Sequence, residues 1–502
     1  MQTPRRMCSI HQVVELVPSD RSARYTSLRW WRGLAMSLLL YLSATPVFAD
    51  LSPGAVWVAN KTVDSVSTYA IAADGTLSPV SEASAGTTPV ALAVHPSGVF
   101  AYGLNNASLP IPDLSVYQID PTNHALTELA RVRACNNPNW LAVHPHGRTL
   151  YFTCNGFAQE LPNVALNALA WLPIDPVTGG PTIDPVTGGP AVNTIYAGGT
   201  RPAEGAVHDS GRYLVLANYL SDLLAVFGLD PDTDAPTLLA SVPIGDRPDA
   251  VDGPVSLAFD ASGTRLFAAL YDARQLWVGN FDATTGALTE AAKVATQGFP
   301  TAVRGHPTNA AVVYVTMNSV QDAMTGEVGI YTLETGLLMW VNTVPTGGAS
   351  TQAIALHRTG QFAYVANHYA LDRHTSGNLA MYAVDAATGN LTPIGLGNIA
   401  TSGFATTVIT SNPVADQARQ DLLARAATDA RFGVPLFGSF AEDLTGEVLA
   451  MPGFEIRWLV FRVTGDRFGV IFHATSTSDL LQRWTLMFVD EQPTPEGWVP
   501  AF

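Results

Sequence analysis

Three residues with the chemistry of an active site lie close together in the stretch "RPAEGAVHDSGRYLVLANY" (201–219). Arg201 could hold an anionic substrate, Glu204 could act as a general base, and Tyr219 could contact the substrate. His208 lies between them, at a position that recurs along the chain. Arg201 and Glu204 are therefore the candidate catalytic residues, and a purely structural Arg–Glu ion pair is the alternative.

The stretch belongs to a repeat. The phrase "PVALAVHPSGVFAYGLNN" (89–106) returns in variant form along the chain, and each copy has one turn residue at the same place: His95, His144, His208, Asp260, His306 and His357. Each unit of about fifty residues holds four short alternating segments separated by Gly, Asp and Pro turns, which is typical of a propeller blade. A histidine that returns at one repeat position predicts a role in the turn, such as bonding to nearby backbone.

Two incomplete units flank the complete ones. Residues 403–413 supply an inner strand without a second strand, and residues 56–80 begin with a second strand that lacks an inner one. We therefore predict an all-β, seven-bladed propeller over 50–413, closed by pairing of its N- and C-terminal strands, which removes two sheet edges. A helical pattern at 414–432 followed by three apolar alternating segments predicts a small C-terminal α+β appendage over 414–502.

The N-terminal region predicts export. Arg29 and Arg32 precede the apolar run "GLAMSLLLYLSATPVFA", which ends at Ala49, so 1–49 is predicted to be a signal peptide and the protein periplasmic or secreted. An uncleaved anchor is the alternative, and we expect no membrane span after signal removal. The leader carries six Arg and two acids in a chain of formal net charge −16, so the mature protein is more acidic still. This charge argues against binding to nucleic acid.

Propeller geometry gathers further polar residues on one face. The loops that enter the inner strands and the loops between second and third strands surround the same end of the channel. The candidate substrate-binding residues there are Asn139, Tyr219, Asp252, Tyr271, Asp272, Gln352 and His368.

Two segments of the sequence could be considered as metal-binding sites. His368, Asp372 and His374 could bind a metal, although their spacing matches no common zinc pattern. The turn "DPDTDA" (230–235) imitates the start of a calcium loop but lacks its Gly and Glu. We therefore expect no metal and no cofactor.

Two cysteines remain after the leader. Cys135 and Cys154 both reach the channel face of one blade, and an exported protein can form disulfides. Hairpin pairing places Asn139, rather than Cys135, opposite Cys154, so the bridge depends on the intervening loop folding over. The sequence leaves a disulfide and two free thiols as alternatives.

Phrases such as "HPSGVFAYGLN" (95–105) and "ANYLSDLLAVFGLDPDT" (217–233) carry a family resemblance. Over about residues 54–413 the chain resembles the seven-bladed lactonase family, which includes bacterial 6-phosphogluconolactonase and carboxymuconate cyclase. The resemblance implies hydrolysis or cyclisation of a small acidic lactone at the channel mouth. The family's enzymes typically carry histidine where inner strands begin, whereas this chain has Pro202-Ala203-Glu204 and Gly253-Pro254-Val255. Arg201 and Glu204 would then act on the lactone.

A function from a different class remains open. The alternative is a non-catalytic propeller that binds a partner protein or an envelope component, with residues 414–502 as the region that would meet a protein partner.

Overall fold

The structure is a computed structural model. It describes residues 54–411 apart from gaps at 107–112, 121, 136, 156–166, 176–177, 185–188, 248, 323, 335 and 373–375, together with strands at 12–16, 449–451, 454–464, 467–476 and 482–489. The chain divides into two compact units, Ser52–Gln420 and a second one made of Met1–Leu51 and Asp421–Phe502. Each unit is described by itself.

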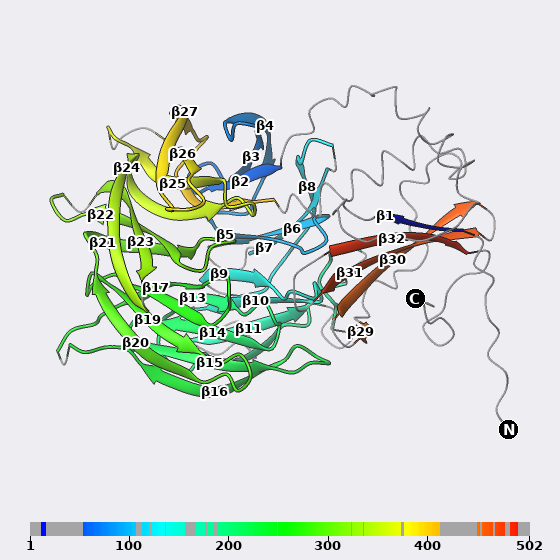
Figure 1. Cartoon of the computed structure of the whole chain (residues 1–502), viewed down its shortest axis with the longest axis horizontal. Helices are drawn as coiled ribbons and strands as arrows, with labels where there is room; N and C mark the ends of the chain where they lie inside the picture. The colour runs from blue at the N-terminus through cyan, green and yellow to red at the C-terminus, as the bar shows by residue number, and fades with distance from the viewer. Residues whose placement is uncertain are drawn as a thin grey trace, which may run out of the picture. The chain divides into compact units, whose positions relative to one another are not determined.

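The larger unit consists of antiparallel sheets (Figure 1). Five of these sheets have four strands each. In sheet order they are β28 (Ala405–Thr410), β2 (Ala55–Asn60), β3 (Ser65–Ile71), β4 (Leu77–Ser84); β5 (Pro89–Val94), β6 (Phe100–Asn105), β7 (Leu114–Ile119), β8 (Leu126–Val132); β9 (Pro138–Val143), β10 (Thr149–Cys154), β11 (Ala168–Pro173), β12 (Asn193–Tyr196); β13 (Pro202–Val207), β14 (Tyr213–Asn218), β15 (Leu223–Leu229), β16 (Pro236–Pro243); and β17 (Pro254–Phe259), β18 (Arg265–Leu270), β19 (Gln275–Phe281), β20 (Leu288–Ala295).

A sixth sheet has seven strands and corresponds to two blades. Its order is β21 (Gly298–Gly305), β22 (Val312–Ser319), β23 (Thr325–Glu334), β24 (Leu337–Leu356), β25 (Phe362–Ala370), β26 (Asn378–Val384) and β27 (Leu391–Ala400). The first half of β24 pairs with β23 and its second half with β25, so one long strand is the outer strand of one blade and the inner strand of the next. The described part of the chain therefore forms seven blades, and the prediction of an all-β, seven-bladed propeller is confirmed.

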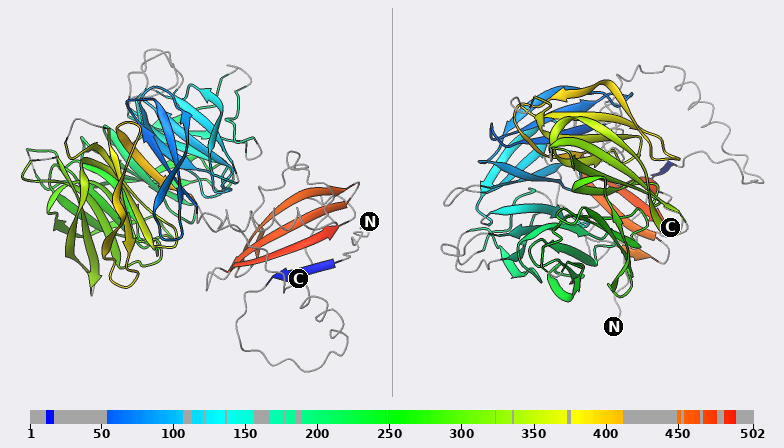
Figure 2. Two further views of the ribbon diagram at one scale, coloured as in Figure 1. Left: turned by 90° about the horizontal axis from the view of Figure 1, so that it is seen from above. Right: turned by 90° about the vertical axis from the view of Figure 1, so that its left-hand side faces the viewer.

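The blades are arranged in a ring (Figure 2). The inner strands contact one another in the cyclic order β5, β9, β13, β17, β21, β24, β28 and back to β5. Strand β28, from the C-terminal end of the propeller, pairs antiparallel with β2 from its N-terminal end, with Val408 opposite Val58. The first blade is thus built from both ends of the propeller segment.

The core lies between adjacent blades. The second strands β2, β6, β10 and β14 are buried at every position. Both faces of such a strand are covered by neighbouring blades, which explains why these segments are nearly continuous apolar runs rather than alternating ones. One apolar cluster, for example, joins β6 and β7 of one blade to β9, β10 and β11 of the next.

The recurring histidines join neighbouring blades. The Nε2 atom of His95 lies 2.7 Å from the Gly147 carbonyl oxygen, and His144 makes the same contact with Gly211 at 2.8 Å. His208 and His306 repeat it with Gly263 and Gly360, both at 3.1 Å. The predicted turn role of these histidines is confirmed, and each bond links a turn to the corresponding turn of the following blade.

The second unit contains a five-stranded sheet. Its order is β1 (Gln12–Leu16), β32 (Gln482–Val489), β31 (Arg467–Ser476), β30 (Phe454–Thr464) and β29 (Leu449–Met451). The three long C-terminal strands match the apolar alternating segments of the predicted appendage, whereas the predicted helix at 414–432 lies outside the described residues. Strand β1 falls within the predicted leader and pairs with β32. Among the described residues, no helix combines the length and apolar character needed to cross a membrane.

Candidate functional site

A pocket of about 260 Å³ opens where three inner strands begin. Its lining residues are Asn139, Arg201, Pro202, Ala203, Tyr219, Val255 and Tyr271. Asn139 and Val255 are the second residues of β9 and β17, and Tyr219 and Tyr271 directly follow β14 and β18. The register shifts just after the first residues of β13 and β17, although Pro202 and Pro254 themselves remain paired with Asn218 and Leu270. Such an irregularity, as in a β-bulge, bends the strand locally beside the pocket.

Arg201 and Tyr219 form one wall of this pocket. Arg201 has a left-handed backbone, with φ 55°, and its N–H donates to Asn167 Oδ1 at 2.7 Å. Its guanidinium lies 4.7 Å from the centre of the Tyr219 ring, within the range of a cation–π contact. A positive charge is thereby held at the pocket, as the sequence predicts for Arg201.

Tyr219 is bonded in turn to an acid. Its hydroxyl donates to Asp272 Oδ2 at 2.5 Å. Burial first, and then the bond to the Asp272 carboxylate, raise the pKa of Tyr219 to about 12, so the hydroxyl stays protonated at neutral pH. Gly253, with φ 73°, packs against this pair, and a Cβ there would lie 2.5 Å from Asp272 Oδ2. A side chain at that position would strain the backbone and push against the Tyr219–Asp272 pair.

Tyr271 forms the other wall. Its ring lies 5.5 Å from that of Phe299, and the guanidinium of Arg274 lies 5.7 Å from the Phe299 ring. The pocket is thus bordered by two tyrosines, each backed by a further aromatic or cationic group.

Glu204 has a partner that the sequence analysis did not name. Its Oε1 lies 2.7 Å from Arg304 Nη2, and its side chain is 19% exposed. Arg304 also donates to Ser256 Oγ at 3.2 Å and to the Val303 carbonyl at 2.7 Å. Glu204 is thus paired with Arg304 on β21 and not with Arg201, as the structural alternative had it, and Glu204 does not line the pocket.

Asp252 is also engaged away from the pocket. It is fully buried, pairs with the Arg247 guanidinium, and accepts the Asp246 N–H at 2.9 Å. Its own N–H donates to the Asp222 carboxylate at 3.0 Å. Asp252 therefore orders the loop before β17 beneath the site.

Gln352 and His368 belong to another part of the ring and do not line the pocket. Gln352 Nε2 donates to the Ser350 carbonyl and hydroxyl, both at 3.0 Å. The His368 ring lies 4.7 Å from Tyr369 and 4.8 Å from Phe404, and burial lowers its pKa. Of the two residues grouped with it as metal ligands, Asp372 is described, whereas His374 lies outside the described residues.

Cys135 and Cys154 form a disulfide next to the pocket. The loop that follows Cys135 leads to Asn139, and Asp113 anchors its start by accepting the N–H groups of Ala134 at 2.5 Å and Cys135 at 2.7 Å. Asn155, directly after Cys154, donates through Nδ2 to the Pro202 carbonyl at 2.8 Å. The bridge thus stiffens the segment that presents Asn139 to the pocket.

The sequence could have revealed one missed residue. Most inner strands have alanine at the position of Arg304, as at Ala93, Ala142, Ala206 and Ala355. An arginine there departs from the repeat and predicts a charged partner inside the ring. The Tyr219–Asp272 bond has no such sequence signal, because it depends on how two neighbouring blades are set against each other.

The fold is a seven-bladed propeller, and its pocket lies where the inner strands β9, β13 and β17 begin. Residues 167–305 match the family model "Lactonase, 7-bladed beta-propeller", and the resemblance of this chain to the lactonase propellers is thereby supported. No curated protein matches the sequence of the chain.

Solved structures share the fold. The periplasmic gluconolactonase PpgL of Pseudomonas aeruginosa superposes with a TM-score of 0.56 at 17% identity, covering 71% of this chain and 99% of that chain. A candidate 6-phosphogluconolactonase of Bacteroides uniformis gives 0.58 at 17% identity, with the same coverage of 71% and 99%. A protein of Lactobacillus plantarum gives 0.55 at 17% identity, again covering 71% and 99%. At this identity the likeness concerns the fold.

Proposed function

We propose that this protein is an exported lactonase that hydrolyses a small acidic lactone in the pocket between Tyr219 and Tyr271. The observation that carries the proposal is the arrangement of Arg201, Tyr219 and Asp272 at the pocket of a lactonase-like propeller. The three side chains are held by contacts of 4.7 Å and 2.5 Å, so an anion contact and a proton acceptor stand side by side.

Each group has a distinct role in this reaction. Arg201 binds the negative charge of the substrate or of the developing oxyanion. As water adds to the lactone carbonyl, the Tyr219 oxygen takes the proton of the water and Tyr219 passes its own proton to Asp272. The ring C–O bond then breaks and the proton returns along the same path to the leaving oxygen, which gives the hydroxy acid.

Glu204 is the competing candidate for the base. Its carboxylate is paired with Arg304 at 2.7 Å, and it does not line the pocket. In this proposal Glu204 and Arg304 stiffen the inner strands, and the pocket chemistry belongs to Tyr219 and Asp272.

The test is a hydrolysis screen of uncharged and carboxylate-bearing lactones. Replacing Arg201 by Ala should lower kcat/KM for acidic lactones by about ten- to a hundredfold, because a charged hydrogen bond is lost. The matched control is Arg212→Ala, since Arg212 also lies over a tyrosine, 5.6 Å from the Tyr213 ring. Equal rates for the two variants on every lactone would contradict the proposal, and so would a Glu204→Gln variant that alone abolishes activity.

The second candidate function is binding of a protein partner, and an exposed apolar surface on β24 supports it. The first half of β24 exposes Leu337, Met339, Trp340 and Val341, each between 41% and 60%. Such a run of exposed apolar side chains on an outer strand is unusual for a solvent-facing surface. The test is a pull-down with the wild type and with a Met339→Lys/Val341→Lys variant, with lactonase kinetics of both proteins measured in parallel. The variant should lose the partner and keep any lactonase activity, which separates partner binding from catalysis.

A further inference from the structure

One inter-blade turn departs from its sister turns at three positions. In most blades the turn histidine contacts a hydroxyl two residues later through Nδ1. His95 contacts Ser97 at 2.7 Å, His208 contacts Ser210 at 2.8 Å, and His357 contacts Thr359 at 2.7 Å. In the turn of His144 this hydroxyl is replaced by a second imidazole, His146, whose ring centre lies 4.6 Å from that of His144.

The second departure is Asp234, in the turn between β15 and β16. Its carbonyl accepts the hydroxyl of Tyr151 at 2.6 Å. In two other blades the corresponding tyrosine donates to a glycine, as Tyr314 does to Gly389 and Tyr364 to Gly75, both at 2.9 Å, and in a third blade Trp57 donates to the His124 carbonyl at 3.1 Å. These glycines have φ of 73° and 82°, and Asp234 has the same left-handed backbone with φ 55°. A residue with a side chain costs about 1 kcal/mol more than glycine in that conformation.

The third departure makes room for the Asp234 side chain. The first residue of the second strand is usually large and packs against the turn glycine, as Phe100 does at Gly179 and Tyr213 at Gly286. In this blade that residue is Thr149, which donates from Oγ1 to Asp234 Oδ2 at 3.0 Å. Asp234 is consequently buried, with 2% of its surface exposed.

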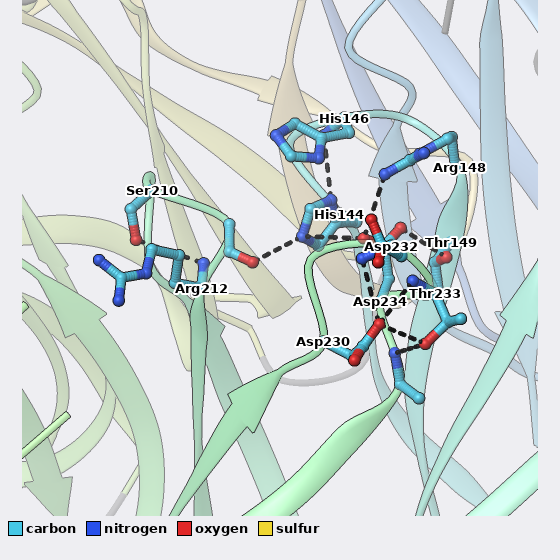
Figure 3. Close-up of polar contacts among 12 residues, drawn as sticks. His144, His146, Arg148, Thr149, Ser210, Arg212, Asp230, Asp232, Thr233 and Asp234 are labelled. Carbon is cyan, nitrogen blue, oxygen red and sulfur yellow. Dashed lines mark hydrogen bonds and ion pairs between the residues drawn. The ribbon is translucent and has the colours of Figure 1, made fainter. Parts of the chain in front are cut away.

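The three departures meet at one point between two blades (Figure 3). His144, His146 and Asp234 each bring one donor atom within 4.8 Å of the others. His144 Nε2 and Asp234 Oδ1 are 3.7 Å apart, which is too long for a hydrogen bond. Two ligands of a tetrahedral zinc ion, with bonds of about 2.0 Å, lie roughly 3.3 Å apart. The His144–Asp234 pair is close to this separation, and the His146 side chain would have to move toward the other two to complete the site.

We propose that His144, His146 and Asp234 bind a divalent ion of the zinc class, which fastens the blade β9–β12 to the blade β13–β16. Two imidazoles and a carboxylate are a common donor set for this class of ion, and a water molecule would complete four-coordination. His146 is half-buried, which leaves a route from solvent. The ion would replace the contact between His144 Nε2 and the Gly211 carbonyl, and Asp234 would remain 3.6 Å from the Arg148 guanidinium.

The repeat itself supplies the test variants. His146→Ser and Asp234→Gly each restore the residue found in sister turns, so both should fold. The matched control is Asp232→Asn, because Asp232 is an exposed carboxylate in the same turn as Asp234.

The measurement is titration of the chelator-treated full chain with Zn²⁺ by calorimetry and with Co²⁺ by visible absorption. We expect one ion per chain, tetrahedral Co²⁺ bands, and affinity at least about tenfold weaker in His146→Ser and Asp234→Gly, but unchanged in Asp232→Asn. Absence of binding at millimolar Zn²⁺ would overturn the proposal. Binding that both restoring variants retain at full affinity would also overturn it, because the ion would then lie elsewhere. Circular dichroism of each variant confirms that it is folded.

Discussion

The two ends of the inner strands follow opposite rules. At the turn end, histidines return blade after blade and make the same contact to a glycine carbonyl, at 2.7 Å from His95 and 3.1 Å from His306. At the pocket end, the residues that face the channel differ from blade to blade, as at Asn139 on β9 and Val255 on β17. Repetition therefore identifies the scaffold, and the positions that break it identify candidate chemistry.

At the turn end, one inter-blade contact also breaks the repeat. His146, Asp234 and Thr149 all depart from their sister residues, and all three lie in one inter-blade contact. A single departure would be an ordinary substitution. Three departures that meet in space indicate a site.

The largest expected effect is at the pocket end. Replacing Tyr219 by Phe removes the hydroxyl that joins the pocket to Asp272, and should lower kcat for lactone hydrolysis by about 10²- to 10⁴-fold, the usual loss when a general acid–base group is removed. The matched control is Tyr213→Phe, whose hydroxyl donates to the Thr284 carbonyl at 2.8 Å outside the pocket. Steady-state kinetics that show similar losses in both variants would contradict the assignment.

Loss of the disulfide should lower the free energy of unfolding and, to a smaller extent, raise KM. Replacing both Cys135 and Cys154 by Ser opens a loop closed across 19 positions. The expected loss is about 3 kcal/mol in free energy of unfolding according to the chain-entropy account. Urea unfolding measures this loss, and KM should rise because the segment leading to Asn139 loosens. An unchanged free energy of unfolding together with an unchanged KM would show that the bridge does not support the pocket.

A substitution at the turn end should lower the stability of the fold and leave the activity unchanged. Replacing His95 by Ala removes its contacts with Gly147 and Ser97 and should lower the free energy of unfolding by about 1–3 kcal/mol. The lactonase kinetic constants of the folded protein should stay unchanged, because His95 lies in the β5–β6 turn, on a blade that contributes no lining residue to the pocket. Denaturant unfolding and kinetics on the same sample give both values. A loss of kcat without a loss of stability would contradict the division into two ends.

The smallest effect concerns pH. Burial and the bond to Asp272 raise the pKa of Tyr219 to about 12, so the folded protein keeps this proton above pH 10. The lactonase rate, corrected for spontaneous hydrolysis, should therefore not fall between pH 7 and pH 10. A decline with a midpoint near 10, the ordinary value for tyrosine, would show that Tyr219 titrates freely.

The fold was predictable because the repeat is visible in the sequence. Four alternating segments per unit, with turns at fixed offsets, define a blade, and the incomplete units at both ends indicate the seventh. What the sequence does not show is the long β24, in which the connection between two blades remains extended from Leu337 to Leu356. The sequence "PTGG" (345–348) between the two halves reads as a turn, and the continuity of the strand arises only from the pairing of its halves with β23 and β25 in the assembled sheet.

The pocket was predictable only in part. Asn139, Arg201, Tyr219 and Tyr271 line it, because loops of adjacent blades bring them together. Gln352 and His368 are both on the blade of β25, further around the ring, so sharing a face with the pocket does not place them in it. The bonds Glu204–Arg304 and Tyr219–Asp272 join different blades, and their formation depends on blade-to-blade geometry that no local pattern records.

The central claim is that the pocket between Tyr219 and Tyr271 binds the acid that the proposed reaction produces. A crystal structure of the protein soaked with the hydroxy acid of its best lactone tests this claim most directly. We predict density in the pocket, with the carboxylate within hydrogen-bond distance of Arg201 and the hydroxyl near Tyr219. Density beside Glu204 and Arg304 instead, with the pocket empty, would contradict it.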